Sequence, residues 1–547
     1  MSTSTPDSAD QGTEGAPQGK TFKKHSWPVP RGYRTIPARF NIAREVLERP
    51  IAEGRAAQVA LRDVKGELTF QELADAVEGL AAGLRELGIA RGTTFLLRGA
   101  NCREILVAFL AGVKLGAVPI LAHSLLGRRE LAHVVDNGEP VIAVVHSEAA
   151  AAVRELQREH RPFRHVVLID GAESGEIAFD AILRRGERAE TADTGKDDPA
   201  FVAYTSGTTG LPKGIVHAHR WVVGNGDFAR LHMPLVAGDA VMHTSEVSFG
   251  WGLGHGFLWP LRNGGSVALL GARPSAETVL AAIEHFGVTV LATVPTLVRS
   301  ILSIPDAERR YRLGSLRLAY VAGEPLAEPT YREWTRRFPC ELYDVYGASE
   351  FQVIVANGPG LPVKPGSMGR AHPGMTIRVL DEALNELGPG EIGGLAVRAD
   401  DPALFLEYRK QPEKWRDVHR GGWYETGDQV YQDEEGYFWY VGRGDDLFKS
   451  RGYLISPKEI EDSLLELPGI QESAVVAQPD PDLGNRIRAV VVLREGMVAS
   501  ESLAVTMRDQ LRGRIAPYKI PHTIVFTDSL PKSPVGKILR RLLREAP

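Results

Sequence analysis

The chain has 547 residues, a formal net charge of −5 and a hydrophobic content of 43%. This length exceeds what one hydrophobic core supports, so we expect at least two domains. The mild acidity argues against a nucleic-acid partner. The two cysteines, Cys102 and Cys340, are far apart, which suits a reducing cytosol and excludes a disulfide framework. No apolar run reaches the roughly 18 residues of a membrane span, and the N-terminus lacks the apolar segment of a signal peptide. We therefore expect a cytoplasmic protein.

The predicted elements begin after a polar tail. Residues 1–23 are rich in Ser, Thr, Asp, Gln and Gly, and we expect them to be disordered. Thr69 and Glu72 form a capping box ahead of an amphipathic run, and Ser275 caps a helix predicted over 276–286. Strand-like stretches lie at 95–97, 201–204, 266–270, 288–292, 316–321 and 341–346. This alternation of strands and helices predicts an α/β fold, layered, with mostly parallel sheets.

A second, smaller unit follows a charged, glycine-bearing stretch at 442–446. Ser456, Pro457 and Glu459 are the cap, the first-turn proline and the third-position carboxylate of a helix start. About a hundred residues from there to the C-terminus are typical of a small α+β domain. We expect an N-terminal domain over 24–443 and a C-terminal domain over 444–547.

The strongest chemical signal is the run YTSGTTGLPKG at 204–214, which follows a predicted strand. Its glycines let backbone N–H groups turn inward, and its hydroxyls add donors, so the loop can surround phosphate oxygens. Lys213 adds positive charge for a developing pyrophosphate. A Walker P-loop requires glycine before the lysine and Ser or Thr after it, but Pro212 and Gly214 stand there. A plain surface loop is the bland alternative, and the order of these eleven residues disfavours it.

With four further motifs, the chain resembles the adenylate-forming superfamily of acyl- and aryl-coenzyme A synthetases, nonribosomal peptide synthetase adenylation domains and firefly luciferase. These motifs follow in family order: YGASE at 346–350, YETGD at 424–428, GRGDD at 442–446 and PKSPVGK at 531–537. The resemblance covers nearly the whole chain after the tail. It implies an ATP-dependent ligase that first makes an acyl-adenylate with Mg²⁺ and then a thioester with coenzyme A.

The resemblance also implies a nucleotide site. ATP or AMP would contact Thr205, Ser206, Gly207, Thr208, Thr209, Gly210, Gly323, Glu324, Tyr346, Gly347, Ser349, Asp428 and Arg443. Within this set, Tyr346 would stack on adenine and Asp428 would accept both ribose hydroxyls, which suits a bidentate anion. Ser349, where the family more often has threonine, would touch the α-phosphate. Glu350 would ligate Mg²⁺, which prefers oxygen ligands and substrate phosphates.

Lys537 is the implied catalytic lysine of the C-terminal domain, alongside Glu350 and Lys213. It would bridge the carboxylate and the nucleotide during adenylation. The small domain would then swing about a hinge at Asp445 and act as a mobile lid. Its coenzyme A side would be Lys449, Ser450, Arg451 and Gly452. The bland alternative makes Lys537 part of a basic tail with its neighbouring arginines.

The run FGWGLGHG at 249–256 alternates glycine with larger residues. On an extended chain this alternation puts the glycines on one face, leaving a flat slot that Trp251 could wall. Close strand packing explains the glycines equally well. The run is similar to that of benzoate- and 2-aminobenzoate-coenzyme A ligases, which implies an acyl pocket of Gly250, Trp251, Tyr346 and Val353 for an aryl acid. Val353 stands where benzoate ligases carry histidine, which leaves the aryl acid open.

Three functions remain at this point. The first is an AMP-forming aryl-coenzyme A ligase acting on a benzoate- or 2-aminobenzoate-type acid. The second is a stand-alone adenylation enzyme that loads an aryl acid onto a carrier protein in trans. The third is a nucleotide-binding sensor without catalysis, which the intact Glu350, Asp428 and Lys537 disfavour. We expect small-molecule partners, with no nucleic acid and no membrane.

Overall fold

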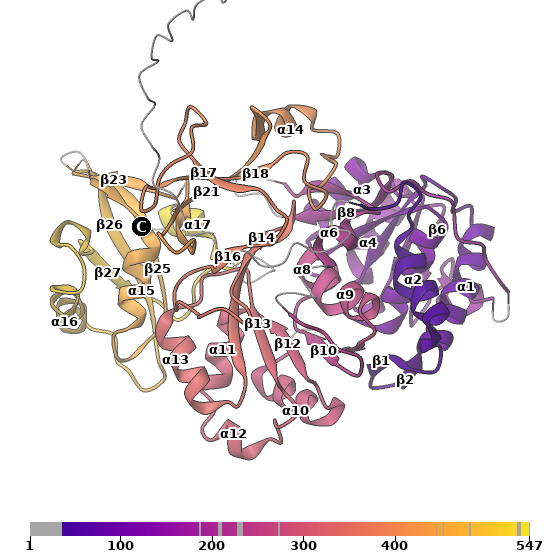
Figure 1. Cartoon of the computed structure of the whole chain (residues 1–547), viewed down its shortest axis with the longest axis horizontal. Helices are drawn as coiled ribbons and strands as arrows, with labels where there is room; N and C mark the ends of the chain where they lie inside the picture. Colours follow the sequence, from indigo (N-terminus) through magenta and orange to yellow (C-terminus); the bar gives the residue numbers. More distant parts are fainter. Residues whose placement is uncertain are drawn as a thin grey trace, which may run out of the picture.

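The computed structural model describes residues 35–184, 187–205, 211–226, 233–271, 274–444, 446–451, 453–480, 483–532 and 538–545. Figure 1 shows three β-sheets with their helices and, on the left, a smaller C-terminal unit coloured orange to yellow. The predicted α/β architecture, a large N-terminal part with mostly parallel sheets and a smaller C-terminal part, is confirmed. No helix within the described ranges is both long and apolar enough for a membrane crossing.

The first sheet has eight strands, with helices on both faces. The strands are β3 (Thr94–Arg98), β4 (Val118–Ala122), β5 (Ile142–Val145), β6 (His165–Leu168), β7 (Ile177–Ala178), β8 (Pro199–Thr205), β9 (Lys213–Ala218) and β19 (Glu407–Tyr408). Their order is β19-β9-β8-β4-β3-β5-β6-β7, antiparallel only at the β8–β9 and β9–β19 pairs. The covering helices are α1 (Phe70–Glu86), α2 (Arg103–Lys114), α3 (Arg128–Gly138), α4 (Ala150–His160) and α5 (Phe179–Ile182). Successive strand residues point to opposite faces: Phe95 and Leu97 pack with α1 and α2, whereas Leu96 packs with α3 and α4.

The second sheet has nine strands and carries two of the predicted nucleotide segments, Gly323-Glu324 and the motif at 346–350. The strands are β1 (Val59–Asp63), β2 (Gly66–Thr69), β10 (Ala240–His243), β11 (Ser266–Ala268), β12 (Val290–Thr293), β13 (Leu318–Val321), β14 (Glu341–Ala348), β15 (Gln352–Ala356) and β16 (Arg370–Ala371). Their order is β16-β15-β14-β13-β12-β10-β11-β1-β2, with the run from β14 to β1 parallel. The helices beside it are α6 (Trp221–Gly226), α8 (Gly250–Leu253), η4 (Gly254–Leu258), α9 (Trp259–Arg262), α10 (Ala276–Phe286), α11 (Pro295–Leu302), α12 (Ala307–Arg310) and α13 (Glu328–Arg337), and η1 (Arg44–Glu48) and η2 (Ile51–Arg55) precede β1.

The third sheet is antiparallel. It contains β17 (Ile377–Leu380), β18 (Gly393–Arg398), β20 (His419–Arg420), β21 (Trp423–Gln432) and β22 (Phe438–Arg443), with α14 (Pro412–Val418) beside it. The hairpin of β21 and β22 places Asp428 opposite Arg443, two of the predicted nucleotide contacts.

The C-terminal unit has its own small core. It consists of β23 (Phe448–Ser450), β24 (Tyr453–Ile455), α15 (Pro457–Leu465), β25 (Ile470–Asp480), β26 (Gly484–Leu493), α16 (Glu501–Leu511), η5 (Pro517–Lys519), β27 (Thr523–Phe526) and α17 (Arg540–Glu545). Ile460, Val475, Ile487 and Met507 are buried together between the sheet and its helices. The limits of the domains, at residues 23 and 443, stay predictions.

Helix caps show how far local sequence determines these elements. Thr69 and Glu72 form the predicted capping box of α1, and Ser275 caps α10 by accepting from the Thr278 N–H. Ser456 precedes α15 as predicted, but its hydroxyl donates to the Val441 carbonyl instead of capping the helix. That side chain therefore ties α15 to β22 of the N-terminal part.

Both cysteines are free thiols. Cys102 is half-buried at the start of α2, and Cys340 is buried in the core under α13. Burial raises the pKa of each thiol to about 12.

Candidate active site

The predicted adenine contacts lie near the carboxyl ends of β13 and β14. The two strands are parallel neighbours, with Val321 opposite Asp344. Gly323-Glu324 and Tyr346 each follow these positions by a few residues, so they leave the same edge of the sheet. In parallel sheets this carboxyl edge is where ligands bind.

Glu324 is held in place by the start of α11. Its carboxylate accepts from the Thr296 backbone N–H at 2.6 Å and from the Thr296 hydroxyl, and the Arg299 guanidinium lies 3.2 Å away. Gly323 has a φ of 92°, a conformation that side chains disfavour, so glycine is required for this turn. The predicted adenine slot is therefore a fixed turn rather than a loose loop.

Lys213, Glu350 and Tyr408 form a buried charged cluster. The Lys213 ammonium lies 2.6 Å from the Glu350 carboxylate, and the Tyr408 hydroxyl donates to the same oxygen at 3.0 Å. Burial pushes the pKa of Glu350 upward, but the charge and hydrogen bonds of Lys213 and Tyr408 outweigh it, so that pKa lies below its ordinary value. Glu350 is therefore ionised at neutral pH.

This cluster fits a magnesium site that substrate phosphates and water would complete. The described residues contain no group of three or more His, Cys, Asp or Glu side chains that could hold a metal alone. Mg²⁺ commonly takes one or two protein carboxylates together with substrate phosphates and water. Glu350, ionised and 7% exposed, provides one such carboxylate beside a lysine that can turn to a phosphate.

Tyr346, Asp428 and Arg443 meet in a second polar cluster. The Tyr346 hydroxyl donates to one Asp428 oxygen, and Arg443 lies 3.2 Å from the other. Burial and then the Asp428 charge hold the pKa of Tyr346 well above its ordinary value, so its hydroxyl stays a donor. The Asp428 backbone N–H is bound by the Thr426 hydroxyl. The structure thus brings together three residues that the sequence separates by almost a hundred positions.

The predicted acyl pocket lies where α8 packs against the β14–β15 hairpin. A methyl group at Gly250 would lie 1.7 Å from the Gln352 side-chain nitrogen, and one at Gly347 would lie 1.9 Å from the Gln352 carbonyl oxygen. Val353, buried, and Trp251, partly exposed, belong to the same hydrophobic cluster. Gly250, Trp251 and Val353 are therefore grouped around one contact between a helix and a hairpin, whereas the fourth predicted pocket residue, Tyr346, packs against another hydrophobic cluster.

The glycine run itself is helical, so the expectation of an extended chain with all glycines on one face is wrong. Residues 250–253 form α8, and the π-helical turn η4 follows. In a helix, alternate residues point to nearly opposite sides. Accordingly Gly250 faces Gln352, Gly252 faces the Glu246 carbonyl, and Gly256 faces His243. Close packing in several directions, rather than one bare face, accounts for these glycines.

Two buried histidines flank the Trp251 ring. The ring centroids lie 5.3 Å from that of His243 and 3.7 Å from that of His255. Burial lowers the pKa of His243 to about 3 and holds that of His255 well below its ordinary value. Both rings are therefore neutral at physiological pH and pack against Trp251.

Family models match this chain over most of its length. The model described as "AMP-binding enzyme" matches residues 49–408, and the model described as "AMP-binding enzyme C-terminal domain" matches residues 459–537. The chain belongs to the AMP-binding enzyme family. It is an AMP-forming acyl-coenzyme A synthetase, an acid–thiol ligase that uses ATP, Mg²⁺ and coenzyme A.

Individual relatives of this AMP-binding enzyme carry different acids in their names. It is 32% identical to a benzoate–CoA ligase of Thauera aromatica, covering 93% of this chain and 97% of that protein. It is 31% identical to an acetyl-coenzyme A synthetase of Bacillus subtilis (strain 168), covering 92% and 90%. It superposes with a TM-score of 0.88 on the anthranilate CoA ligase AuaEII in complex with anthranoyl-AMP, at 29% identity, covering 94% and 98%.

Several predicted contacts of this AMP-binding enzyme lie outside the described residues: Ser206, Gly207, Thr208, Thr209, Gly210, Asp445, Gly452 and Lys537. The two ends of the phosphate loop are described. Thr205 ends β8 and pairs with Lys213 at the start of β9, so the loop closes a hairpin. Gly347 is the second-to-last residue of β14, and Ser349 lies beside Glu350 in the turn between β14 and β15. On the coenzyme A side, Lys449 and Ser450 end β23, and the Ser450 hydroxyl donates to the Asn485 carbonyl.

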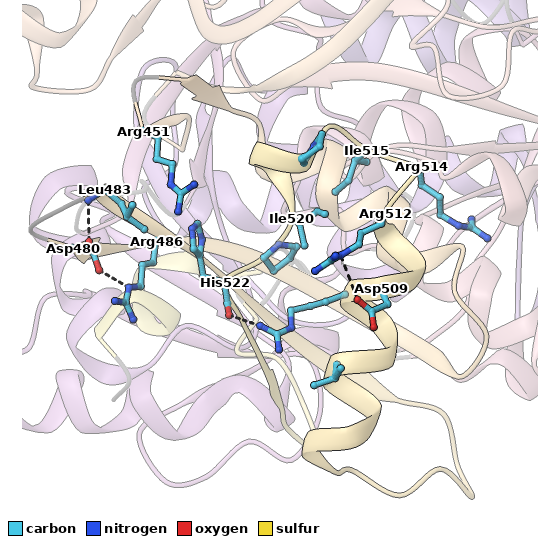
Figure 2. A pocket seen from close by; sticks show the side chains of 15 residues that line it. Arg451, Asp480, Leu483, Arg486, Asp509, Arg512, Arg514, Ile515, Ile520 and His522 are labelled. Atoms are coloured by element: carbon cyan, nitrogen blue, oxygen red, sulfur yellow. Dashed lines mark hydrogen bonds and ion pairs between the residues drawn. The ribbon is translucent and has the colours of Figure 1, made fainter.

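The C-terminal unit contains a basic cavity, and Arg451 is the one lining residue that the sequence predicted as part of a site. The cavity has a volume of about 1140 Å³ and lies among the β23 and β25 ends, α16 and η5 (Figure 2). Its charged lining consists of Arg451, Arg486, Arg508, Arg512, Arg514, Asp480 and Asp509, with His522 beside them. Burial and the charges of Arg451 and Arg486 lower the pKa of His522. Because the arginines come from three separate stretches of the chain, no single sequence motif indicates the cavity.

Proposed function

We propose that this AMP-binding enzyme is an aryl-coenzyme A ligase for a benzoate- or 2-aminobenzoate-type acid. The observation that carries the proposal is the tight contact between α8 and the β14–β15 hairpin at Gly250, beside the partly exposed Trp251 ring. The flat face of a partly exposed aromatic side chain suits a planar ring, which would contact it over a larger area than acetate would. Relatives named for benzoate and anthranilate support the same class.

The two polar clusters would have different roles in adenylation. Glu350 would hold Mg²⁺, which neutralises phosphate charge when bound. Lys213 would turn from Glu350 toward the phosphates, and Asp428 with Tyr346 and Arg443 would fix the ribose. These groups are preorganised by hydrogen bonds before any substrate binds, which is how charge stabilisation becomes effective.

The C-terminal unit would contribute in both half-reactions. Lys537 would contact the carboxylate and nucleotide during adenylation, and a swing about Asp445 would then bring residues 449–452 to the acyl-adenylate. The two half-reactions would thus use different faces of one mobile lid.

The basic cavity supports coenzyme A over a carrier protein as the thiol donor. Coenzyme A carries a diphosphate and a 3′-phosphate, whereas the phosphopantetheine arm of a carrier lacks the nucleotide. Five arginines against two aspartates give a positive lining beside Arg451, which belongs to the predicted coenzyme A side. Such a lining attracts phosphates.

The test is an acid panel scored by pyrophosphate release and by thioester formation. Benzoate and 2-aminobenzoate should exceed acetate and palmitate in kcat/KM. Coenzyme A should exceed dephospho-coenzyme A and a purified carrier protein as acceptor. A higher kcat/KM for acetate or palmitate would overturn the aryl proposal. Preference for the carrier protein would instead identify a stand-alone adenylation enzyme.

A further inference from the structure

Gln352 occupies an unusual place in the acyl site. It begins β15, two residues after Glu350, and its φ of 60° lies in the left-handed region that few residues other than glycine adopt. The other four residues of β15 are apolar and buried. Gln352 is itself only 4% exposed. A polar side chain in a strained backbone conformation at this depth is typical of a functional position.

Two glycines make room for this one residue. Gly250 in α8 admits the Gln352 carboxamide, because a methyl group there would lie 1.7 Å from Nε2 and 3.1 Å from Oε1. Gly347 in β14 admits its backbone, because a methyl group there would lie 1.9 Å from the Gln352 carbonyl oxygen. The carboxamide is thereby directed against α8, one residue from Trp251.

The carboxamide has no hydrogen-bond partner among the residues that the structure describes. A glutamine amide can donate two hydrogen bonds and accept two more. Neither amide atom is among the fully buried side-chain atoms that lack a partner, so the carboxamide reaches accessible space. Its nitrogen lies against Gly250 of α8, one residue from Trp251. A molecule bound in that space can therefore supply the partner.

We propose that the Gln352 carboxamide selects the acid by hydrogen bonding to a polar substituent on its ring. The inference rests on the proposed function and narrows it: the substrate class is amino- or hydroxy-substituted aryl acids, and unsubstituted benzoate is the poorer member. Oε1 accepts from a ring amino or hydroxyl group, and Nε2 donates to a ring oxygen. Trp251 and Val353 contact the ring itself, so Gln352 supplies the polar recognition.

The experiment compares benzoate with its 2-amino, 3-hydroxy and 4-hydroxy derivatives in the wild-type enzyme and in Gln352→Leu, which keeps the size and removes the hydrogen bonds. We expect the wild type to favour its best substituted acid over benzoate by about 10- to 100-fold in kcat/KM, because a site built to hydrogen-bond rejects an analogue that lacks the group. In Gln352→Leu the preference should fall to about threefold or less, chiefly through benzoate gaining. The KM for ATP should not change.

The control is Gln432→Leu, which removes a glutamine amide from the end of β21 and should leave the preference intact. The inference is overturned if wild-type enzyme treats benzoate and its derivatives alike, a comparison that needs no variant to fold. It is also overturned if Gln352→Leu slows all acids equally, because Gln352 would then only fill space. Activation of aliphatic acids alone would contradict the proposed function instead.

Discussion

The predicted nucleotide side and the predicted acyl side of this enzyme are built by different physical means. On the nucleotide side, charged and polar groups meet in two clusters: Lys213 with Glu350, and Asp428 with Tyr346 and Arg443. On the acyl side, glycines bring backbones close, and Trp251 lies among neutral aromatic rings. We therefore expect one side to stabilise charge and the other to select shape.

The difference predicts which kinetic constant each side controls. Electrostatic contacts that strengthen as charge develops should act mainly on kcat, whereas shape contacts made equally in ground and transition state should act mainly on KM for the acid. The following three changes test this division.

Replacing the buried carboxylate should have the largest effect. Glu350→Gln keeps the shape and removes the charge that would hold Mg²⁺, so adenylation should slow about 100- to 1000-fold. The KM for the acid should change little. Pyrophosphate release in a single turnover is the measurement. Lys537→Ala is the corresponding change in the C-terminal domain, and we expect it to slow adenylation as well.

The control for both variants is thioester formation from pre-made acyl-adenylate. If Glu350 and Lys537 act only in the first half-reaction, this transfer should proceed at close to the wild-type rate. Equal slowing of both half-reactions would show that the two sites are not separable in this way.

Filling the acyl side should have a smaller and different effect. Gly250→Leu would displace the Gln352 side chain and intrude beside Trp251, so we expect the KM for the aryl acid to rise about 10-fold or more. The KM for ATP should stay within about twofold. Steady-state kinetics with each substrate varied in turn would show it, and equal increases in both constants would contradict the division.

The smallest effect should come from a buried carboxyl that lacks the close cation of Glu350. Burial raises the pKa of Asp344 on β14 to about 7. The folded state thus keeps a proton that the unfolded state loses above about pH 4, so this group's stabilising contribution declines between about pH 4 and pH 7. In Asp344→Asn that decline is absent. Denaturant unfolding at pH 5 and pH 8 should show the variant gaining about 2–3 kcal/mol relative to wild type over this range. An unchanged difference between the two proteins would show that Asp344 ionises normally.

Local sequence was sufficient for much of the fold. The capping box at Thr69 and the Ser275 cap depend on residues three positions apart, and the strands of both parallel sheets were visible as short apolar runs. The grouping of Tyr346, Asp428 and Arg443 was accessible because motif order implied it. Their mutual contacts were not, because three separate strands bring them together.

The wrong prediction arose where one spacing of residues is compatible with two structures. Alternating glycines suit an extended chain and a tightly packed helix equally well, and only the neighbours of Gly252 and Gly256 decide in favour of the helix. Gln352 was missed because one polar residue at the start of an apolar strand resembles an ordinary strand end. The basic cavity was missed because its arginines gather from distant turns.

The state of the two thiols offers a way to test the proposed movement of the C-terminal domain. A pKa of about 12 leaves Cys102 and Cys340 almost without thiolate at neutral pH, so alkylating reagents should react with them far more slowly than with an exposed cysteine. Single cysteines introduced on the surface of each domain could then be labelled selectively in the otherwise wild-type chain. A fluorophore pair attached in this way would report the distance between the domains as ATP, acid and coenzyme A are added in turn.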